Sequence, residues 1–226
     1  MTIRDSRSAD TCVASPPPLR RRATKRAFDL AVASVFLLAL LPFLLAVGVM
    51  VRLTTPGRAL FSQVRLGQYG RPFVLYKFRT MYDGCPDHLH RAYVHELLTG
   101  TPRADVAAGL YKLDADPRVT KVGRLLRRTS IDELPQLLNV IRGQMSLVGP
   151  RPALPWEAEM FDAVHQQRFS VLPGLTGLWQ VSGRNALTIR EGLELDLEYV
   201  RWQSFLLDLA LLLKTVPVVL STAGAR

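Results

Sequence analysis

The chain has 226 residues, is 48% hydrophobic and carries a formal net charge of +10 at pH 7. Its two cysteines form no Cys-x-x-Cys motif, which argues against a disulfide framework and a cysteine zinc site. Residues 1–82 contain 13 Lys/Arg and 3 Asp/Glu, whereas residues 83–226 contain 16 of each. Because the positive excess surrounds one apolar stretch and no recognised nucleic-acid motif occurs, the pattern favours an anionic membrane face over nucleic acid.

The first 22 residues are expected to form a disordered basic tail. They are rich in Ser and Thr, include the run SPPP and offer little to bury. Five basic residues then lie between Arg20 and Arg26. The stretch from Leu30 to Val51 follows with 22 residues and no charge, long enough for a helix to cross a bilayer core.

Two features of this apolar stretch indicate that it re-enters the membrane rather than spans it. Pro42 lies in its middle, where a proline removes a helix hydrogen bond and favours a kink. Both flanks are basic, and Lys and Arg gather on the cytoplasmic side of a membrane. A helix over residues 23–55 that enters, bends at Pro42 and returns satisfies both flanks. An ordinary kinked spanning helix is the alternative.

Ala59 to Met81 is expected to form a β-hairpin, because two runs of strand-forming residues flank the Gly-containing stretch LGQYG. Residues 83–110 are weakly patterned, and we expect a loop with a short helix near Leu89–Leu98. The later segments are expected to be a turn into a basic helix over 117–128, a helix over 130–142, a Pro-rich connection over 149–155, a helix over 156–169, a Gly-rich loop over 173–184 and a helix over 187–200.

Phe205 to Leu220 is the second strongly apolar segment. It contains Asp208, Lys214 and Pro217, so it is a poor candidate for a spanning helix. We expect a helix that lies at the membrane interface or packs beneath the domain, with a plain core helix as the alternative.

The run SIDELPQLLNVIRG, residues 130–143, is the most informative in the chain. The spacing of a buried helix face is followed by Leu134, Leu137, Leu138 and Ile141. Ser130 and Glu133 have capping-box spacing, which places Asp132 and Glu133 in the first turn. Pro135 complicates this start, and a helix that begins at Pro135 is the alternative. Acids in a first turn also suit the helix dipole without any function.

The surrounding charge gives the two acids a further meaning. Asp132 and Glu133 are the only acids in the 40 residues from 117 to 156, which contain seven basic residues. Such a field keeps carboxylates ionised and attracts anions. Magnesium commonly bridges a carboxylate and phosphate oxygens, and a carboxylate can attack phosphorus. The composition therefore suggests a Mg²⁺-assisted phosphate site.

Five motifs in this order resemble the bacterial sugar transferases, the small monotopic phosphoglycosyl transferases. The longest is DPRVTKVGRLLRRTSIDELPQLLNVIRGQMSLVGPRP at 116–152. The others are KRAFDLAVAS at 25–34, LYKFRTM at 75–81, PGLTGLWQVSGRN at 173–185 and ELDLEYVRWQSFLLDLALLLKT at 194–215. The resemblance extends over roughly residues 24–220.

The resemblance implies transfer of a phosphosugar from a UDP-sugar to a polyprenyl phosphate, with release of UMP. Asp132 would be the nucleophile that carries the phosphosugar, and Glu133 would hold Mg²⁺. Arg151, in the motif GPRP, matches a phosphate-binding position. Four further residues match polar positions of the site with less defined roles: Lys77, Arg79, Arg184 and Asp196. The family also uses a re-entrant helix broken near its middle, in agreement with Pro42.

The sequence therefore predicts an α+β, mainly α, protein: a basic tail over 1–22, a re-entrant membrane helix over 23–55 and a cytoplasmic catalytic domain over 56–226, with a short hairpin and interface-lying amphipathic helices. The expected location is the cytoplasmic face of a bacterial inner membrane, in contact with its lipid and not with nucleic acid. Two alternatives remain, a basic membrane module without activity and a glycosyltransferase that moves the sugar alone. Neither the sugar nor the oligomeric state follows from the sequence, although the form is similar to enzymes that start exopolysaccharide units with galactose or glucose phosphate.

Overall fold

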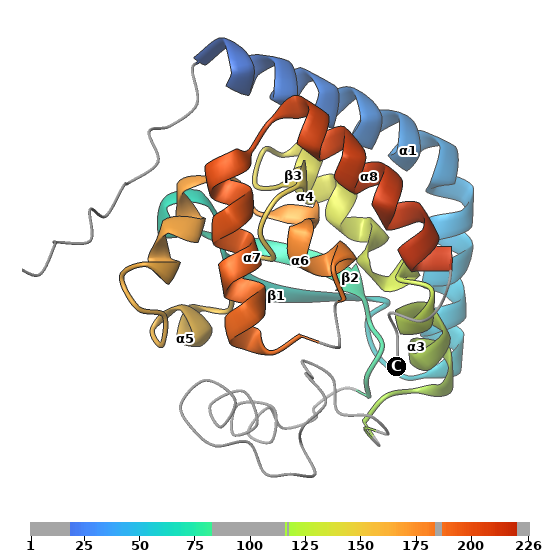
Figure 1. Ribbon diagram of the computed structural model, residues 1–226. Helices are drawn as coiled ribbons and strands as arrows, with labels where there is room; N and C mark the ends of the chain where they lie inside the picture. Colours follow the sequence, from blue (N-terminus) through green and yellow to red (C-terminus); the bar gives the residue numbers. More distant parts are fainter. Residues whose placement is uncertain (1–18, 83–115, 117, 184–186, 221–226) are drawn as a thin grey trace, which may run out of the picture.

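The computed structural model describes residues 19–82, 116, 118–183 and 187–220 (Figure 1). Helices predominate, with two small sheets, in agreement with the predicted α+β class. The elements in chain order are α1 (Leu19–Thr54), β1 (Leu60–Leu66), η1 (Gln68–Gly70), β2 (Pro72–Phe78), α3 (Lys121–Arg128), η2 (Ile131–Gln136), α4 (Leu137–Ile141), β3 (Ser146–Val148), α5 (Pro155–Ala158), η3 (His165–Ser170), β4 (Gly174–Thr176), α6 (Leu178–Val181), α7 (Ile189–Trp202) and α8 (Phe205–Leu220).

Helix α1 is long, apolar and bent around one side of the domain. Figure 1 shows it running over the top of the molecule and then turning down along one edge. Pro42 lies inside the helix. An 18-residue window has a mean hydropathy of 2.8 and only 17% of it is buried, so length and composition would allow this one described helix to cross a membrane. Its outer face exposes large apolar side chains, among them Leu38, Leu45 and Leu53.

Both ends of α1 are fastened to the same domain. Near its start, Arg26 donates hydrogen bonds to the carbonyl oxygens of Val140 and Ile141 at 2.6 and 2.9 Å. Just beyond its last residue, Arg79 donates to the carbonyl oxygen of Thr55 at 2.7 Å. The bend allows a single helix to reach both places.

Strands β1 and β2 form the predicted antiparallel hairpin, with Phe61 opposite Lys77 and Arg65 opposite Phe73. One edge of β2 pairs with β1, and Asn139 of α4 covers the other edge. The Asn139 amide donates to the Val74 carbonyl at 2.7 Å, and its Oδ1 accepts from the Tyr76 N–H at 3.2 Å. A fully buried side chain thus replaces a third strand and fixes α4 against the hairpin.

A second sheet, which the sequence did not predict, joins β3 and β4 in parallel. The segment 173–184 was expected to be a Gly-rich loop, yet its described part contains β4 and the short helix α6. The pairing depends on close backbone approach. A Cβ added at Gly174 would collide with the backbone of Gly149, so only glycine fits there.

Two predicted helices are interrupted. The segment 130–142 is a 3₁₀ turn, η2, followed by the short helix α4, because Pro135 has no N–H for a regular α-helical bond. The capping box is wrong: Ser130 has a left-handed φ of 55° and its side chain makes no cap hydrogen bond. The segment 156–169 likewise divides into α5 and η3, and the Asp162 carboxylate accepts from the His165 N–H at 2.8 Å to start the second turn.

Helices α7 and α8 follow the prediction closely. Thr188 and Glu191 form a capping box at the start of α7. Helix α8 lies beside the first half of α1 (Figure 1), where the Phe28 and Phe205 rings meet edge to face at 5.1 Å. Its Asp208 and Leu211 are buried, whereas several leucines, including Leu206 and Leu213, are exposed. Helices α1 and α8 thus present exposed apolar faces.

Candidate functional site

Asp132 and Glu133 lie in η2, which packs against β2 of the hairpin. The Glu133 N–H donates to the Ser130 carbonyl at 3.2 Å, which closes the turn. Asp132 is buried, at 7% exposure, and Glu133 is partly exposed. The unusual left-handed conformation of Ser130 turns the chain sharply out of α3, so the acid pair sits at the junction of α3 and the hairpin.

Lys77, on β2, places its ammonium group near the acid pair. Burial, helped by the positive charge of Arg65, lowers the pKa of Lys77 from 10.5 to about 8, and the negative charges of Asp132 and Glu133 oppose this shift. The ammonium group also lies 5.1 Å from the centre of the Phe61 ring. A lysine that is still mostly charged at neutral pH therefore stands beside two carboxylates.

Arg127, from the last turn of α3, is the second cation of the acid pair. Its Nε donates to the Thr80 hydroxyl at 2.9 Å, which fixes the guanidinium against the end of the hairpin. Burial lowers the pKa of Arg127, and the negative charge of Asp132 is the largest effect in the opposite direction. We refer to Asp132, Glu133, Lys77, Arg65 and Arg127 as the acid–base cluster.

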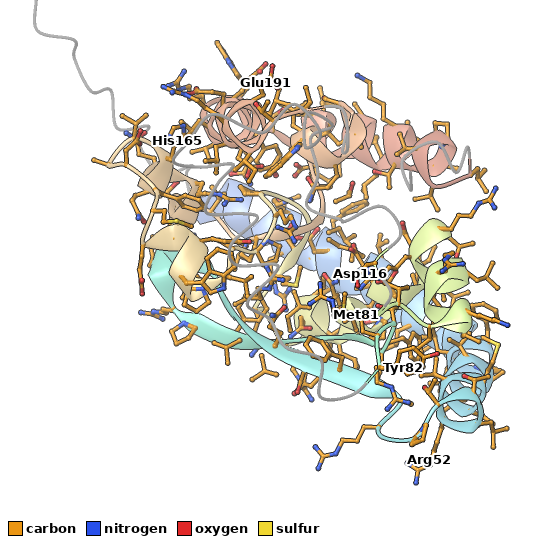
Figure 2. The ribbon with its side chains drawn as sticks, turned by 90° about the horizontal axis from the view of Figure 1, so that it is seen from below. Arg52, Met81, Tyr82, Asp116, His165 and Glu191 are labelled. Atoms are coloured by element: carbon orange, nitrogen blue, oxygen red, sulfur yellow. The ribbon has the colours of Figure 1, made fainter. Side chains whose placement is uncertain are left out.

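Asp116 and Arg118 form a bidentate ion pair next to this cluster. Arg118 Nη2 lies 2.8 Å from Asp116 Oδ2, and hydrogen bonds from Arg118 hold the pKa of Asp116 below its usual range. The negative charge of Asp116 also acts to raise the pKa of Arg127. Figure 2 shows Asp116 near Met81 and Tyr82, and the Tyr82 N–H donates to the Arg118 carbonyl at 2.9 Å. The pair therefore joins the end of the hairpin to the segment that leads into α3.

Arg151 belongs to a second polar group, with Arg168 and Asp196. Arg168 Nη2 donates to the Arg151 carbonyl at 2.7 Å and forms a buried ion pair with Asp196 at 2.5 Å. Burial raises the pKa of Asp196 to about 6, against the attraction of Arg168 and then Arg151. Asp196 thus holds the backbone of the GPRP loop through Arg168.

The hairpin also holds the GPRP loop. Arg65 Nη1 donates to the Pro152 carbonyl at 3.0 Å, and the Leu66 N–H donates to the Ala153 carbonyl at 2.9 Å. The positive charge of Arg65 also lowers the pKa of Lys77. One arginine therefore links the GPRP loop to the other members of the acid–base cluster.

Arg79 lies elsewhere. Its guanidinium is buried and binds the backbone carbonyls of Thr55 and Pro56, so it fastens the end of α1 instead of facing the acid pair. Arg184 lies outside the described residues, as do the loop 83–110 and residues 1–18 of the predicted basic tail over 1–22.

The carboxylates of the acid pair fit a magnesium ion that is shared with a substrate phosphate better than an ion held by protein side chains alone. Within the described ranges no group of three or more His, Cys, Asp or Glu side chains could hold a metal ion. Mg²⁺ usually takes one or two carboxylates and completes its coordination with water and substrate phosphate oxygens. The adjacent carboxylates of Asp132 and Glu133 meet that requirement.

Sequence reasoning did not select Arg65, Arg127 or Arg168 as site residues. For Arg65 a signal was available: in a hairpin, residues that differ by an even number share a face, and cross-strand partners share it too. Arg65 is therefore on the face of Lys77. Arg168 is 28 residues from Asp196, and no local pattern connects them.

Comparison with known proteins places the whole described chain in one group. The family model for the bacterial sugar transferases matches residues 20–222. The exopolysaccharide production protein ExoY of Sinorhizobium fredii is 41% identical over 203 residues, 89% of this chain and 88% of that protein.

Two longer relatives have names that state a reaction. The UDP-galactose-lipid carrier transferase of Erwinia amylovora is 42% identical over 206 residues, 90% of this chain and 42% of that protein. The undecaprenyl-phosphate galactose phosphotransferase of Salmonella typhimurium is 40% identical over 206 residues, with the same two coverages. The chain spans less than half the length of these two relatives.

Proposed function

Because this chain belongs to the bacterial sugar transferase family, we propose that it transfers a sugar-1-phosphate from a UDP-sugar to polyprenyl phosphate and releases UMP. The chain is a phosphoglycosyl transferase. The donor and acceptor classes are supported by the names of the two longer relatives, one of which refers to UDP-galactose and the other to undecaprenyl phosphate. The match to ExoY supports a role at the start of exopolysaccharide synthesis.

The single observation that carries the mechanism is a buried carboxylate, Asp132, among fixed cations. We infer a two-step reaction. In the first step an Asp132 oxygen attacks the β-phosphorus of the UDP-sugar, the bond from that phosphorus to the bridging oxygen breaks, and UMP leaves with the electron pair. In the second step an oxygen of the lipid phosphate attacks the same phosphorus, and the Asp132 carboxylate leaves.

Lys77 and Arg127 are the residues that balance the negative charge of the transferring phosphoryl group. Both are held by other contacts, Lys77 on β2 and Arg127 through Thr80, so they need not reorganise as charge develops. Glu133 would hold Mg²⁺, which supplies a positive charge that neutralises the diphosphate. Without such a cation a carboxylate repels the phosphate that it must approach.

We place the catalytic domain on the cytoplasmic face of the inner membrane, with α1 as a re-entrant helix. Arg26 and Arg79 fasten opposite ends of α1 to one domain, which supports a topology with both ends on the same side of the bilayer. The exposed apolar faces of α1 and α8 support contact with lipid. The basic flanks favour the cytoplasmic side.

Purified full-length protein, incubated with a panel of UDP-sugars, polyprenyl phosphate and Mg²⁺, tests the proposed function. We expect UMP from at least one donor, loss of more than about 1000-fold in rate for Asp132→Asn, and a loss of similar size for Glu133→Gln or excess chelator. A control variant, Glu198→Gln, replaces an exposed carboxylate on α7, away from the cluster, and should retain full rate. Release of UDP instead of UMP would show that the sugar moves alone and would contradict the proposal.

A further inference from the structure

A basic cavity of about 640 Å³ lies between the end of α1 and the start of the hairpin. It is lined by Arg52, Pro56, Gly57, Arg58, Leu60, Phe61, Ser62 and Arg79. Three of these eight residues are arginines and none is acidic. Its volume lies in the range of small-molecule sites, and its charge favours an anion.

Several carbonyl groups at the end of α1 are hydrogen-bonded, which reduces their repulsion of a neighbouring anion. A helix C-terminus carries a partial negative charge on its free carbonyl groups, which would repel phosphate. Here the Thr54 hydroxyl donates to the Met50 carbonyl at 2.9 Å, the Thr55 hydroxyl donates to the Val51 carbonyl at 3.3 Å, and Arg79 binds the two carbonyls beyond. Four carbonyl groups around the helix end, those of Met50, Val51, Thr55 and Pro56, are therefore bound without Arg52 or Arg58.

Arg52 and Arg58 are the exposed cations of this cavity. Within the part of the chain that the structure describes, neither forms an ion pair with a carboxylate. Figure 2 shows Arg52 at the end of α1, at the rim of the domain. Their charges are thus available to a ligand.

The cavity lies between the exposed apolar surface at the end of α1 and the acid–base cluster. Leu53, at the end of α1, is 81% exposed, and Leu60 at the cavity wall is 44% exposed. On the other side, Phe61 lines the cavity while its ring contacts the Lys77 ammonium. One aromatic side chain therefore separates the basic cavity from the lysine beside Asp132.

We propose that this cavity binds the phosphate group of the lipid acceptor through Arg52 and Arg58, while the apolar tail lies along the exposed face of α1. The inference rests on the proposed function and assigns one of its substrates to a place. The lipid phosphate stays bound beside Phe61 and Lys77 while the donor reacts at Asp132. The donor diphosphate uses the acid–base cluster and not the cavity.

The two half-reactions, measured separately, test this assignment. In the first, the full-length protein in neutral-lipid nanodiscs receives UDP-sugar with a labelled β-phosphate and no acceptor, and protein-bound label is followed. In the second, the labelled enzyme receives polyprenyl phosphate over a range of concentrations. The variants are Arg52→Gln, Arg58→Gln and the double variant. Arg71→Gln is the matched control, because Arg71 is exposed, carries the same charge and lies at the opposite end of the same hairpin.

We expect unchanged labelling in the first half-reaction and an acceptor concentration for half-maximal transfer raised about tenfold by each single variant, since a charge-assisted hydrogen bond is lost. The control should match the wild type in both. An unchanged acceptor dependence, or an equal loss in both half-reactions, would overturn the assignment. So would an effect that appears only when the nanodiscs contain phosphatidylglycerol, because the cavity would then bind bulk anionic lipid.

Direct binding of polyprenyl phosphate keeps this test independent of the covalent mechanism. If wild-type protein never becomes labelled, the two-step reaction fails, yet equilibrium binding of the acceptor still reports on the cavity. Weaker binding by the double variant and unchanged binding by Arg71→Gln then support the assignment, and equal binding by all three proteins removes it.

Discussion

Lys77 illustrates how single residues acquire their properties from the fold. In sequence it is one basic residue within an apolar strand, and its direction is ambiguous. In the structure β2 places it beside Asp132, and burial lowers its pKa to about 8. Below that pH Lys77 is charged and can balance a phosphoryl group, whereas above it the ammonium loses its proton.

The rate of UMP release should therefore fall as the pH rises through about 8. With saturating UDP-sugar we expect about a tenfold lower contribution from Lys77 at pH 9 than at pH 7. Lys77→Arg keeps its charge in this range, so its rate should be lower at neutral pH but should not fall between pH 8 and 9. An identical alkaline decline in both proteins would show that another group titrates.

Asn139 is a second residue whose role is defined only by the fold. Removing its side chain would leave the buried Val74 carbonyl and Tyr76 N–H without their partner. We expect Asn139→Ala to lower the free energy of unfolding by about 3 kcal/mol. Gln144→Ala removes only the contact between the two side chains and should cost less than about 1 kcal/mol. Equal losses in denaturant titrations of the two variants would show that Asn139 does not hold the hairpin.

At the scale of elements, the sequence was most informative where a pattern is local and long. The hairpin over 59–81 and the helix over 187–200 could be predicted, because alternation, a Gly-containing turn and helical spacing repeat over several residues. The three-residue strands β3 and β4 are too short to show a period, and their partners lie 28 residues apart. Arg168 and Asp196 are also 28 residues apart, so no local pattern predicts their ion pair. The acid pair could be predicted, because Asp132 and Glu133 are the only acids in a basic segment.

The bent helix α1 leads to a prediction of topology. If both ends lie in the cytoplasm, cysteines placed at residues 22 and 58, in a protein whose native cysteines are replaced by serine, should both resist an impermeant thiol reagent applied from the periplasm. Pro42→Leu should straighten α1 and expose one of the two sites in some molecules. Efficient periplasmic labelling of either site in the unmodified helix would establish a spanning segment.

At the scale of the whole molecule, the exposed apolar helix α1 and the acid–base cluster belong to different regions that the hairpin joins. The positive excess of the chain belongs to residues 1–82, which include the membrane helix, whereas residues 83–226 are neutral overall. The hairpin joins these two regions: its start lines the basic cavity, and Lys77 near its end stands beside Asp132. Under the proposed function, a lipid acceptor would therefore not need to leave the bilayer to meet a donor bound on the aqueous side.

The formation of a phosphosugar on Asp132 is the central claim, and it can be measured directly. Wild-type enzyme is mixed with Mg²⁺ and a UDP-sugar labelled in its β-phosphate, without lipid acceptor, quenched in acid and digested for peptide mapping. We predict up to one label per active enzyme on the peptide that contains Asp132, UMP in equal amount, and loss of the label when polyprenyl phosphate is added. No label on that peptide, together with kinetics that require both substrates to bind before UMP leaves, would contradict the account.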